Sequence, residues 1–217
     1  MTADARSVAG AAIYSRTILS VYDIGVLGFS NTFVWKCPTS QILSFYDDHV
    51  SANHLDVGVG TGYFLDKCEF PLESPRITLF DLNRNSLRAT AKRIGRYKPS
   101  VYQGDILKPL DLPHKYGSIG LNYLLHCLPG DMVAKGIVFQ HVKAWLERGG
   151  CVFGTTILGQ GVDQNILARG LMGVYNRKGY FSNSEDSLVG LESVLADSFA
   201  SYETRVVGCV AFFWAYL

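Results

Sequence analysis

Three glycines at alternate positions form the part of the sequence that is best suited to bind a ligand. Gly58, Gly60 and Gly62 follow the short apolar run Leu55–Val57. Glycine tolerates positive φ angles and lets a ligand approach the backbone closely. A ligand here would lie at the carboxyl end of a buried strand, where open α/β sheets bind ligands. A dinucleotide fingerprint needs glycine where Tyr63 stands, and no Gly-Lys-Ser or Gly-Lys-Thr follows, so a pyrophosphate or phosphate loop is disfavoured.

Two aspartates that follow later apolar runs are suited to hold a nucleoside. The carboxylate of Asp81 can accept hydrogen bonds from both hydroxyls of a ribose. Asp105 can accept a hydrogen bond from the exocyclic amine of an adenine, and Leu82 and Ile106 offer apolar surface to the ring. The glycine loop and these two acids together describe a pocket for a nucleoside without phosphates. Each feature also has a purely structural explanation, because glycines often form turns and Asp81 could cap a helix.

The ordered set of motifs resembles the class I S-adenosylmethionine (SAM)-dependent methyltransferases that act on small molecules. The matching pieces are LDVGVGTGYF (55–64), ITLFDLNRNSL (77–87), VYQGDIL (101–107), IGLNYLLHCLP (119–129) and ERGGCVFGTTIL (147–158). They occur in the family's order and cover roughly residues 50–217. The resemblance implies SAM as cofactor and the following contact residues: Asp56, Gly58, Gly60, Gly62, Asp81, Leu82, Asp105, Ile106 and Asn122.

Alternating strand and helix patterns predict a doubly wound, mostly parallel α/β sheet. The resemblance implies that this sheet is the seven-stranded, Rossmann-like sheet of the methyltransferases. Strands are expected at Leu55–Val57, Arg76–Phe80, Val101–Gln103, Gly117–Leu125 and Cys151–Leu158, with two closing strands within Tyr202–Leu217. One helix is expected over Asp131–Arg148, and another is expected to begin after an N-cap at Ser184, with Glu185 and Asp186 in its first turn.

Two apolar segments, residues 1–53 and 159–183, lie outside this alternation. We expect residues 54–217 to form the SAM-binding core, residues 1–53 to form a helical lid that contacts the acceptor, and residues 159–183 to form a second, inserted helical lid. Such lids would supply apolar walls and exclude water. The aromatic and sulfur-containing side chains expected to line the acceptor site, with ordinary packing as the equal alternative, are Tyr14, Tyr22, Trp35, Met172 and Tyr175.

Methyl transfer from a sulfonium is an in-line displacement, so the enzyme chiefly aligns the two reactants. An acceptor of high pKa also needs a base. His126 follows the fourth strand, and an imidazole at the mouth of the pocket would suit this role, although a packing role is the alternative. The predicted function is methyl transfer to oxygen or nitrogen of a small aromatic or polyketide-like secondary metabolite. The alternatives are a SAM-binding enzyme that catalyses another step, such as cyclisation, and a SAM-binding regulatory subunit.

Composition narrows the partners of the protein. The chain is 48% hydrophobic and 18% charged with a net charge of +1, which argues against a basic field for nucleic acid or an anionic membrane. The longest apolar run, Val206–Leu217, is shorter than the roughly 20 residues of a membrane span. Five widely spaced cysteines favour a reduced, cytoplasmic protein. Thr155 and Thr156 stand where a catechol-type metal site would need Asp and Asn, so no metal is expected. The sequence leaves the oligomeric state open.

Overall fold

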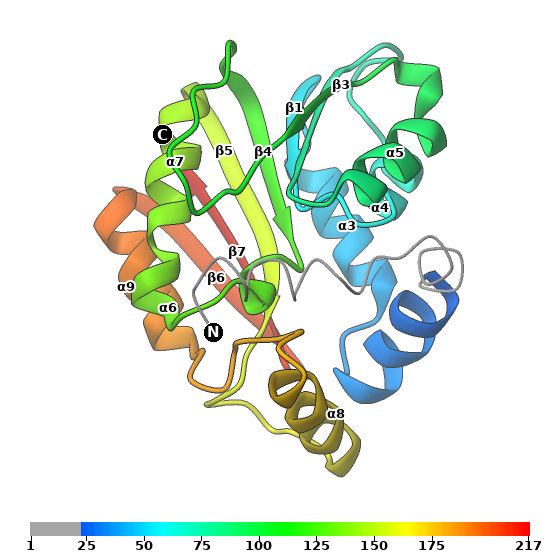
Figure 1. The fold of residues 1–217 in the computed structure, drawn as a ribbon. Helices are drawn as coiled ribbons and strands as arrows, with labels where there is room; N and C mark the ends of the chain where they lie inside the picture. The colour runs from blue at the N-terminus through cyan, green and yellow to red at the C-terminus, as the bar shows by residue number, and fades with distance from the viewer. Residues whose placement is uncertain (1–22) are drawn as a thin grey trace.

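A seven-stranded sheet runs through the centre of the computed structural model, which describes residues 23–217 (Figure 1). The strands lie in the order β3-β2-β1-β4-β5-β7-β6. Their bounds are β1 Asn53–Val57, β2 Arg76–Asp81, β3 Ser100–Gln103, β4 Tyr116–Asn122, β5 Leu146–Ile157, β6 Ser201–Val207 and β7 Val210–Tyr216. The pairs from β3 through β5 are parallel, whereas β7 is antiparallel to both β5 and β6. The predicted doubly wound, mostly parallel sheet is confirmed.

Helices cover both faces of the sheet because its strands are apolar on both sides. In β2, Ile77 and Leu79 pack into one core and Phe80 packs into the other. One face carries α6, α7 and α9, and the other carries α3, α4 and α5, whereas α8 lies beyond the carboxyl ends of the strands (Figure 1). The helix bounds are α3 Thr39–His49, α4 Tyr63–Lys67, α5 Arg84–Arg93, α6 Met132–Lys135, α7 Ile137–Trp145, α8 Ile166–Arg177 and α9 Leu188–Ser198. A π-helix, η1, covers Asp23–Val34, and two short 3-10 helices are η2 Gly95–Tyr97 and η3 Leu125–Cys127.

The single helix predicted over residues 131–148 is wrong. Asp131 caps α6 by accepting a hydrogen bond from the Ala134 amide at 2.9 Å, and Gly136 separates this short helix from α7. The last three residues of the predicted helix already belong to β5, where Leu146 pairs with Tyr116 of β4. Strand pairing therefore outweighs the helical pattern at this end.

The predicted cap at Ser184 is also wrong. Helix α9 begins three residues later, after Ser187, whose side chain accepts a hydrogen bond from the Gly190 amide. Asp186 does not lie in the first turn of this helix. Its carboxylate is fully buried and bonded to Lys135 of α6, so burial of this pair fixes where the chain enters the helix.

Helical structure within residues 159–183 is confirmed by α8, which Asn165 caps by accepting a hydrogen bond from the Ala168 amide. The same Asn165 side chain donates hydrogen bonds to the carbonyl oxygens of Phe33 and Val34 at 3.0 and 3.3 Å. The inserted segment and the end of η1 are therefore tied together beside the carboxyl ends of the strands (Figure 1). Within residues 23–217, every helix is too short or too polar to cross a membrane.

Candidate active site

The loop after β1 has a backbone that requires glycine. Gly58, Gly60 and Gly62 have φ angles of 76°, 53° and 72°, in the left-handed region that most side chains avoid. A Cβ atom on Gly58 would lie 2.9 Å from Leu124 Cδ1, and one on Gly62 would lie 2.7 Å from Thr90 Cγ2. A Cβ atom on Gly60 would meet nothing within 4 Å. The loop is thus packed at its ends and open at its centre, where a ligand can lie against the backbone.

Two adjoining clefts lie along this loop. The first, of about 630 Å³, is lined by residues that include Gly58, Gly60, Asp81, Leu82, Asp105 and Ile106. The second, of about 480 Å³, is lined by residues that include Asp56, Gly58, Gly60, Gly62 and Asn122. Every residue that the sequence singles out for cofactor contact lines at least one of the two clefts. The topology brings them together because β1, β2, β3 and β4 are parallel and end at the same edge of the sheet.

Asp81 lies in the first cleft at the end of β2. Its Oδ1 atom accepts a hydrogen bond from the Asn83 amide at 2.7 Å. Helix α5 is capped by Asn83, whose side chain accepts from the Asn85 amide, so Asp81 is not the cap of this helix. Burial raises the pKa of Asp81 to about 6, against the opposing effect of nearby backbone amides. Hydrogen-bond donors from a ligand would favour the charged form and offset this desolvation.

Asp105 also lines the first cleft and lies just after β3. Its Oδ1 atom accepts a hydrogen bond from the Leu107 amide at 3.0 Å, and its Oδ2 atom lies 3.9 Å from Lys108 Nζ. The neighbouring Ile106 side chain is buried in the core and supplies apolar surface to the cleft. An acid beside an apolar wall fits an aromatic ring that carries an amine.

Asp56 in the second cleft is held in place by a buried chain of hydrogen bonds. The Tyr46 hydroxyl of α3 donates to Asp56 Oδ2 at 2.7 Å and lies 2.8 Å from His54 Nε2. His54 Nδ1 lies 2.8 Å from the Ser118 hydroxyl. Because the Tyr46 hydroxyl donates its proton to Asp56, the Tyr46 oxygen can only accept from His54. This hydrogen bond requires the His54 tautomer in which Nε2 carries the proton. Burial and the Asp56 charge raise the pKa of Tyr46 well above its ordinary value, so the phenol stays protonated as a donor.

Asn122 at the end of β4 offers a free donor to the second cleft. Its Oδ1 atom accepts a hydrogen bond from the Thr155 hydroxyl at 3.2 Å. Its Nδ2 atom is buried and has no hydrogen-bond partner. A buried amide left unpaired costs free energy, so an acceptor atom on a bound ligand would stabilise this arrangement. Together with the open centre of the glycine loop and the acids, this donor fits a zwitterionic amino acid joined to a nucleoside, as in SAM.

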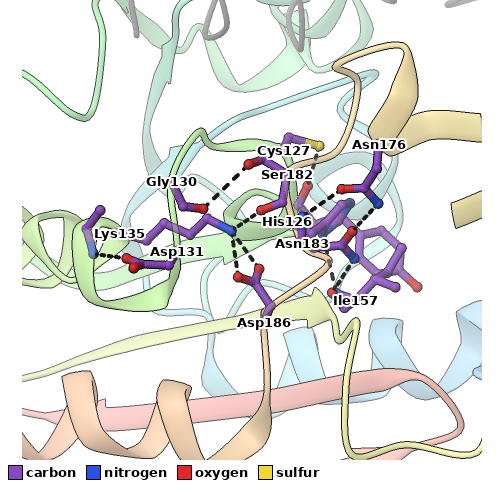
Figure 2. Close-up of polar contacts among 12 residues, drawn as sticks. His126, Cys127, Gly130, Asp131, Lys135, Ile157, Asn176, Ser182, Asn183 and Asp186 are labelled. Atoms are coloured by element: carbon purple, nitrogen blue, oxygen red, sulfur yellow. Dashed lines mark hydrogen bonds and ion pairs between the residues drawn. The ribbon is translucent and has the colours of Figure 1, made fainter. Parts of the chain in front are cut away.

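His126, predicted to lie at the mouth of the pocket, lines neither of the two clefts described above. Its side chain is 3% exposed and packs against the Phe181 ring, with 4.5 Å between the two ring centroids. The Ile157 amide donates to Nδ1 at 3.4 Å, within the polar cluster drawn in Figure 2. Burial and the Lys135 charge lower the pKa of His126 to about 3. The imidazole is therefore enclosed and uncharged at neutral pH, and its catalytic role stays a prediction.

The residues expected to line the acceptor site are placed as follows. Tyr14 and Tyr22 lie outside the described residues. Trp35 is 2% exposed and packs on the Phe181 ring at 6.1 Å, and Tyr175 packs on the same ring at 5.0 Å. Met172 is buried in the same core. Trp35, Met172 and Tyr175 line neither of the two clefts, and their role in an acceptor site stays a prediction beside the packing that the structure describes.

Sequence reasoning passed over Tyr123, which lines both clefts. It follows Asn122 directly, at the carboxyl end of a central strand where ligands bind, and this position was the available signal. The supporting chain from Tyr46 to Ser118 gave no such signal, because its members belong to segments far apart in the sequence.

Comparison with known proteins identifies the family. No family model matches the chain. It is 39% identical to a demethylluteothin O-methyltransferase of Streptomyces thioluteus, over 98% of this chain and 93% of the relative. It is 40% identical to an N-methyltransferase of Penicillium aethiopicum, over 83% of this chain and 76% of the relative. The fold matches that of DhpI, solved in complex with SAH (S-adenosylhomocysteine), with a TM-score of 0.67, 13% identity and coverage of 96% and 95%. The chain belongs to the class I SAM-dependent methyltransferases that act on small molecules.

Proposed function

We propose that the protein transfers the methyl group of SAM to the oxygen of an acidic hydroxyl group on a small metabolite. The observation that carries the proposal is the pair of clefts that meet along the glycine loop, with Asp81 and Asp105 in one and Asp56 and Asn122 in the other. When bound, SAM supplies an electrophilic methyl group on a sulfonium that leaves as a neutral thioether.

Each cleft residue has a specific role in this proposal. Asp81 accepts hydrogen bonds from the ribose hydroxyls, and Asp105 accepts from the adenine amine. Asp56, oriented by Tyr46, accepts from the ammonium group of the amino acid part. The unpaired Nδ2 of Asn122 donates to its carboxylate. The chain thus holds the cofactor at both ends, and catalysis comes mainly from alignment of the acceptor and exclusion of water.

The choice of an acidic hydroxyl is supported by the ionisable groups in the clefts. These are three carboxylates, two phenols and the thiol of Cys127, whose pKa burial raises to about 12. His126, the base suggested by the sequence, is buried beside Tyr123, and burial and the Lys135 charge lower its pKa to about 3. A phenol or enol that ionises near neutral pH supplies its own nucleophilic oxygen and needs no general base.

The relatives support oxygen as the acceptor atom. The relative named as an O-methyltransferase aligns with nearly the whole chain, whereas the one named as an N-methyltransferase aligns with less of it. Nitrogen of a small metabolite is therefore the second candidate. Both names describe methyl transfer, which favours this reaction over cyclisation. The lid role of residues 1–53 and 159–183, the absence of metal and nucleic-acid partners, and a cytoplasmic location stay predictions.

The test is incubation with SAM and a panel of small phenols and enols of graded acidity, each paired with the corresponding amine. We expect product heavier by one methylene group, formed fastest from acidic hydroxyls. The pH profile of kcat/KM should follow the acceptor's own pKa and move when an acceptor of different acidity is used. A profile that stays fixed across acceptors would point to an enzymic base, and methylated amines alone would reassign the acceptor atom. An isobaric product would support cyclisation.

A further inference from the structure

The junction of the two clefts has one side chain that stands out. Among the described lining residues, Gly58, Gly60 and Tyr123 belong to both clefts. The two glycines form the backbone floor of the junction. Of these three shared residues, Tyr123 is the one with a side chain, and its ring packs edge-on against the His126 ring with 5.6 Å between the ring centroids.

Tyr123 is held in an unusual conformation. Its φ angle is 54°, in the left-handed region that bulky residues rarely enter. The Tyr123 amide donates to the Thr155 carbonyl oxygen at 2.8 Å, and the Tyr123 hydroxyl donates to Asn31 Oδ1 at 3.0 Å. Asn31 is fully buried in η1, and its Nδ2 atom donates to the Thr39 hydroxyl at 2.9 Å. Such backbone outliers persist where the surroundings fix them, and they gather at functional sites.

The position of the ring can be matched to one chemical group of the ligand. In SAM the sulfonium joins the ribose to the amino acid chain. If the nucleoside occupies the first cleft and the amino acid occupies the second, the sulfonium falls at their junction. Aromatic rings attract cations through the negative potential of their faces. SAM carries this positive charge, whereas the product SAH is a neutral thioether.

We propose that the Tyr123 ring contacts the sulfonium of SAM and strengthens the binding of SAM more than the binding of SAH. This proposal rests on the proposed function, because it takes SAM as the ligand of the two clefts. The contact orients the reacting methyl group, and its loss after transfer favours release of the product. The hydrogen bond to Asn31 fixes the ring and couples the junction to η1.

The test compares the dissociation constants of SAM and SAH, measured by titration calorimetry, in the wild type and two variants. Tyr123→Asn removes the ring, and asparagine tolerates the left-handed backbone. It should weaken SAM binding by roughly three- to thirtyfold and leave SAH binding nearly unchanged. Tyr123→Phe loses the bond to Asn31 but keeps the ring, and it should keep most of the preference for SAM. Tyr63→Leu, which changes an aromatic residue of the second cleft alone, should affect both ligands equally.

A second measurement avoids any problem with folding of the ring-free variant. Phenylalanine analogues with increasing numbers of fluorine atoms, placed at position 123, keep the ring's shape but progressively reduce its negative potential. The preference for SAM over SAH should decline stepwise along this series. A preference that does not change along the series, or an equal loss of both ligands in Tyr123→Asn, would overturn the proposal while leaving the proposed function intact. A wild-type protein that binds neither ligand would overturn both.

Discussion

At the scale of single residues, Asp81 is the carboxylate on which cofactor binding should depend most. We expect Asp81→Asn to weaken SAM binding by roughly 30- to 100-fold, because charge-assisted hydrogen bonds to the ribose are lost and a hydroxyl is left poorly paired. Titration calorimetry on folded protein measures this directly. Asp47→Asn is the matched control, since Asp47 is a carboxylate that accepts a backbone hydrogen bond from Glu69 outside both clefts. Wild-type affinity in Asp81→Asn would remove Asp81 from the site.

The lowered pKa of His126 predicts how the free energy of unfolding depends on pH. Its pKa is lowered to about 3 in the folded protein from an ordinary value of 6.5. The unfolded chain therefore binds a proton near pH 6.5 while the folded chain does not. The stabilising contribution is present above pH 6.5 and is lost as the pH falls toward 3, at about 1.4 kcal/mol per pH unit.

Urea unfolding between pH 7 and pH 4.5 tests this dependence. The free energy of unfolding of the His126→Gln variant should fall less steeply with acid than that of the wild type. His114→Gln, at an exposed loop position, is the control for loss of a histidine. Parallel acid profiles for the wild type and His126→Gln would contradict the burial argument, and the imidazole would then be open to solvent protons.

At the scale of elements, a buried ion pair ties α6 to the segment that leads into α9. Lys135 Nζ lies 2.6 Å and 2.8 Å from the two carboxylate oxygens of Asp186 and donates to the Ser182 carbonyl oxygen at 2.7 Å, as Figure 2 shows. Both side chains are fully buried. Removal of one partner leaves the other charge in a medium of low dielectric constant, which costs about 3–5 kcal/mol.

We therefore expect Asp186→Leu alone to lower the free energy of unfolding by that amount in urea titrations. The double variant with Lys135→Met and Asp186→Leu should recover most of the loss, because apolar side chains of similar volume replace the pair. The two substitutions thus form a double-mutant cycle in which the coupling separates the pair from ordinary packing. Additive losses would show that the two charges do not stabilise one another.

The strands and the glycine loop were predictable because their signals are local. Apolar runs that end at glycine or aspartate place β1, β2 and β3 and their carboxyl ends within one or two residues. The errors lie where distant residues decide. Leu146 belongs to β5 because it pairs with Tyr116 of β4. Asp186 lies outside α9 because it forms a buried ion pair with Lys135. Local sequence contains neither contact.

The same limit applies within the candidate site. The nine residues predicted to contact the cofactor lie at or just after the carboxyl ends of strands, so the sequence alone groups them along the two clefts. His126 also follows a strand, yet Phe181 from the inserted segment covers it and changes its expected exposure and pKa. The chain Tyr46–His54–Ser118 beneath Asp56 joins three separate segments and has no local signature.

At the scale of the whole molecule, the two ends of the chain contribute differently to the site. Among the described residues, those that line the two clefts belong to the segment from β1 onward, whereas the proposed acceptor contacts include Tyr14 and Tyr22 near the N-terminus. Asn31 and Tyr46 connect the described part of the N-terminal segment to Tyr123 and Asp56. We therefore predict that Tyr14 and Tyr22 act on the acceptor, and that the cofactor contacts supported by Asn31 and Tyr46 do not depend on these two tyrosines.

This division predicts that acceptor turnover and cofactor binding can be separated by mutation. The double variant Tyr14→Ala with Tyr22→Ala should lower kcat/KM for the acceptor by about 10²-fold, because a misaligned acceptor rarely reaches the attack geometry. Its affinity for SAH should stay within about threefold of wild type, since no proposed cofactor contact is altered. Tyr216→Ala, at a 46% exposed position at the end of β7, controls for loss of a surface aromatic residue. Steady-state kinetics and titration calorimetry on the same preparations give both quantities. Parallel loss of SAH affinity would mean that the N-terminal segment holds the cofactor, and unchanged kcat/KM would remove both tyrosines from the acceptor site.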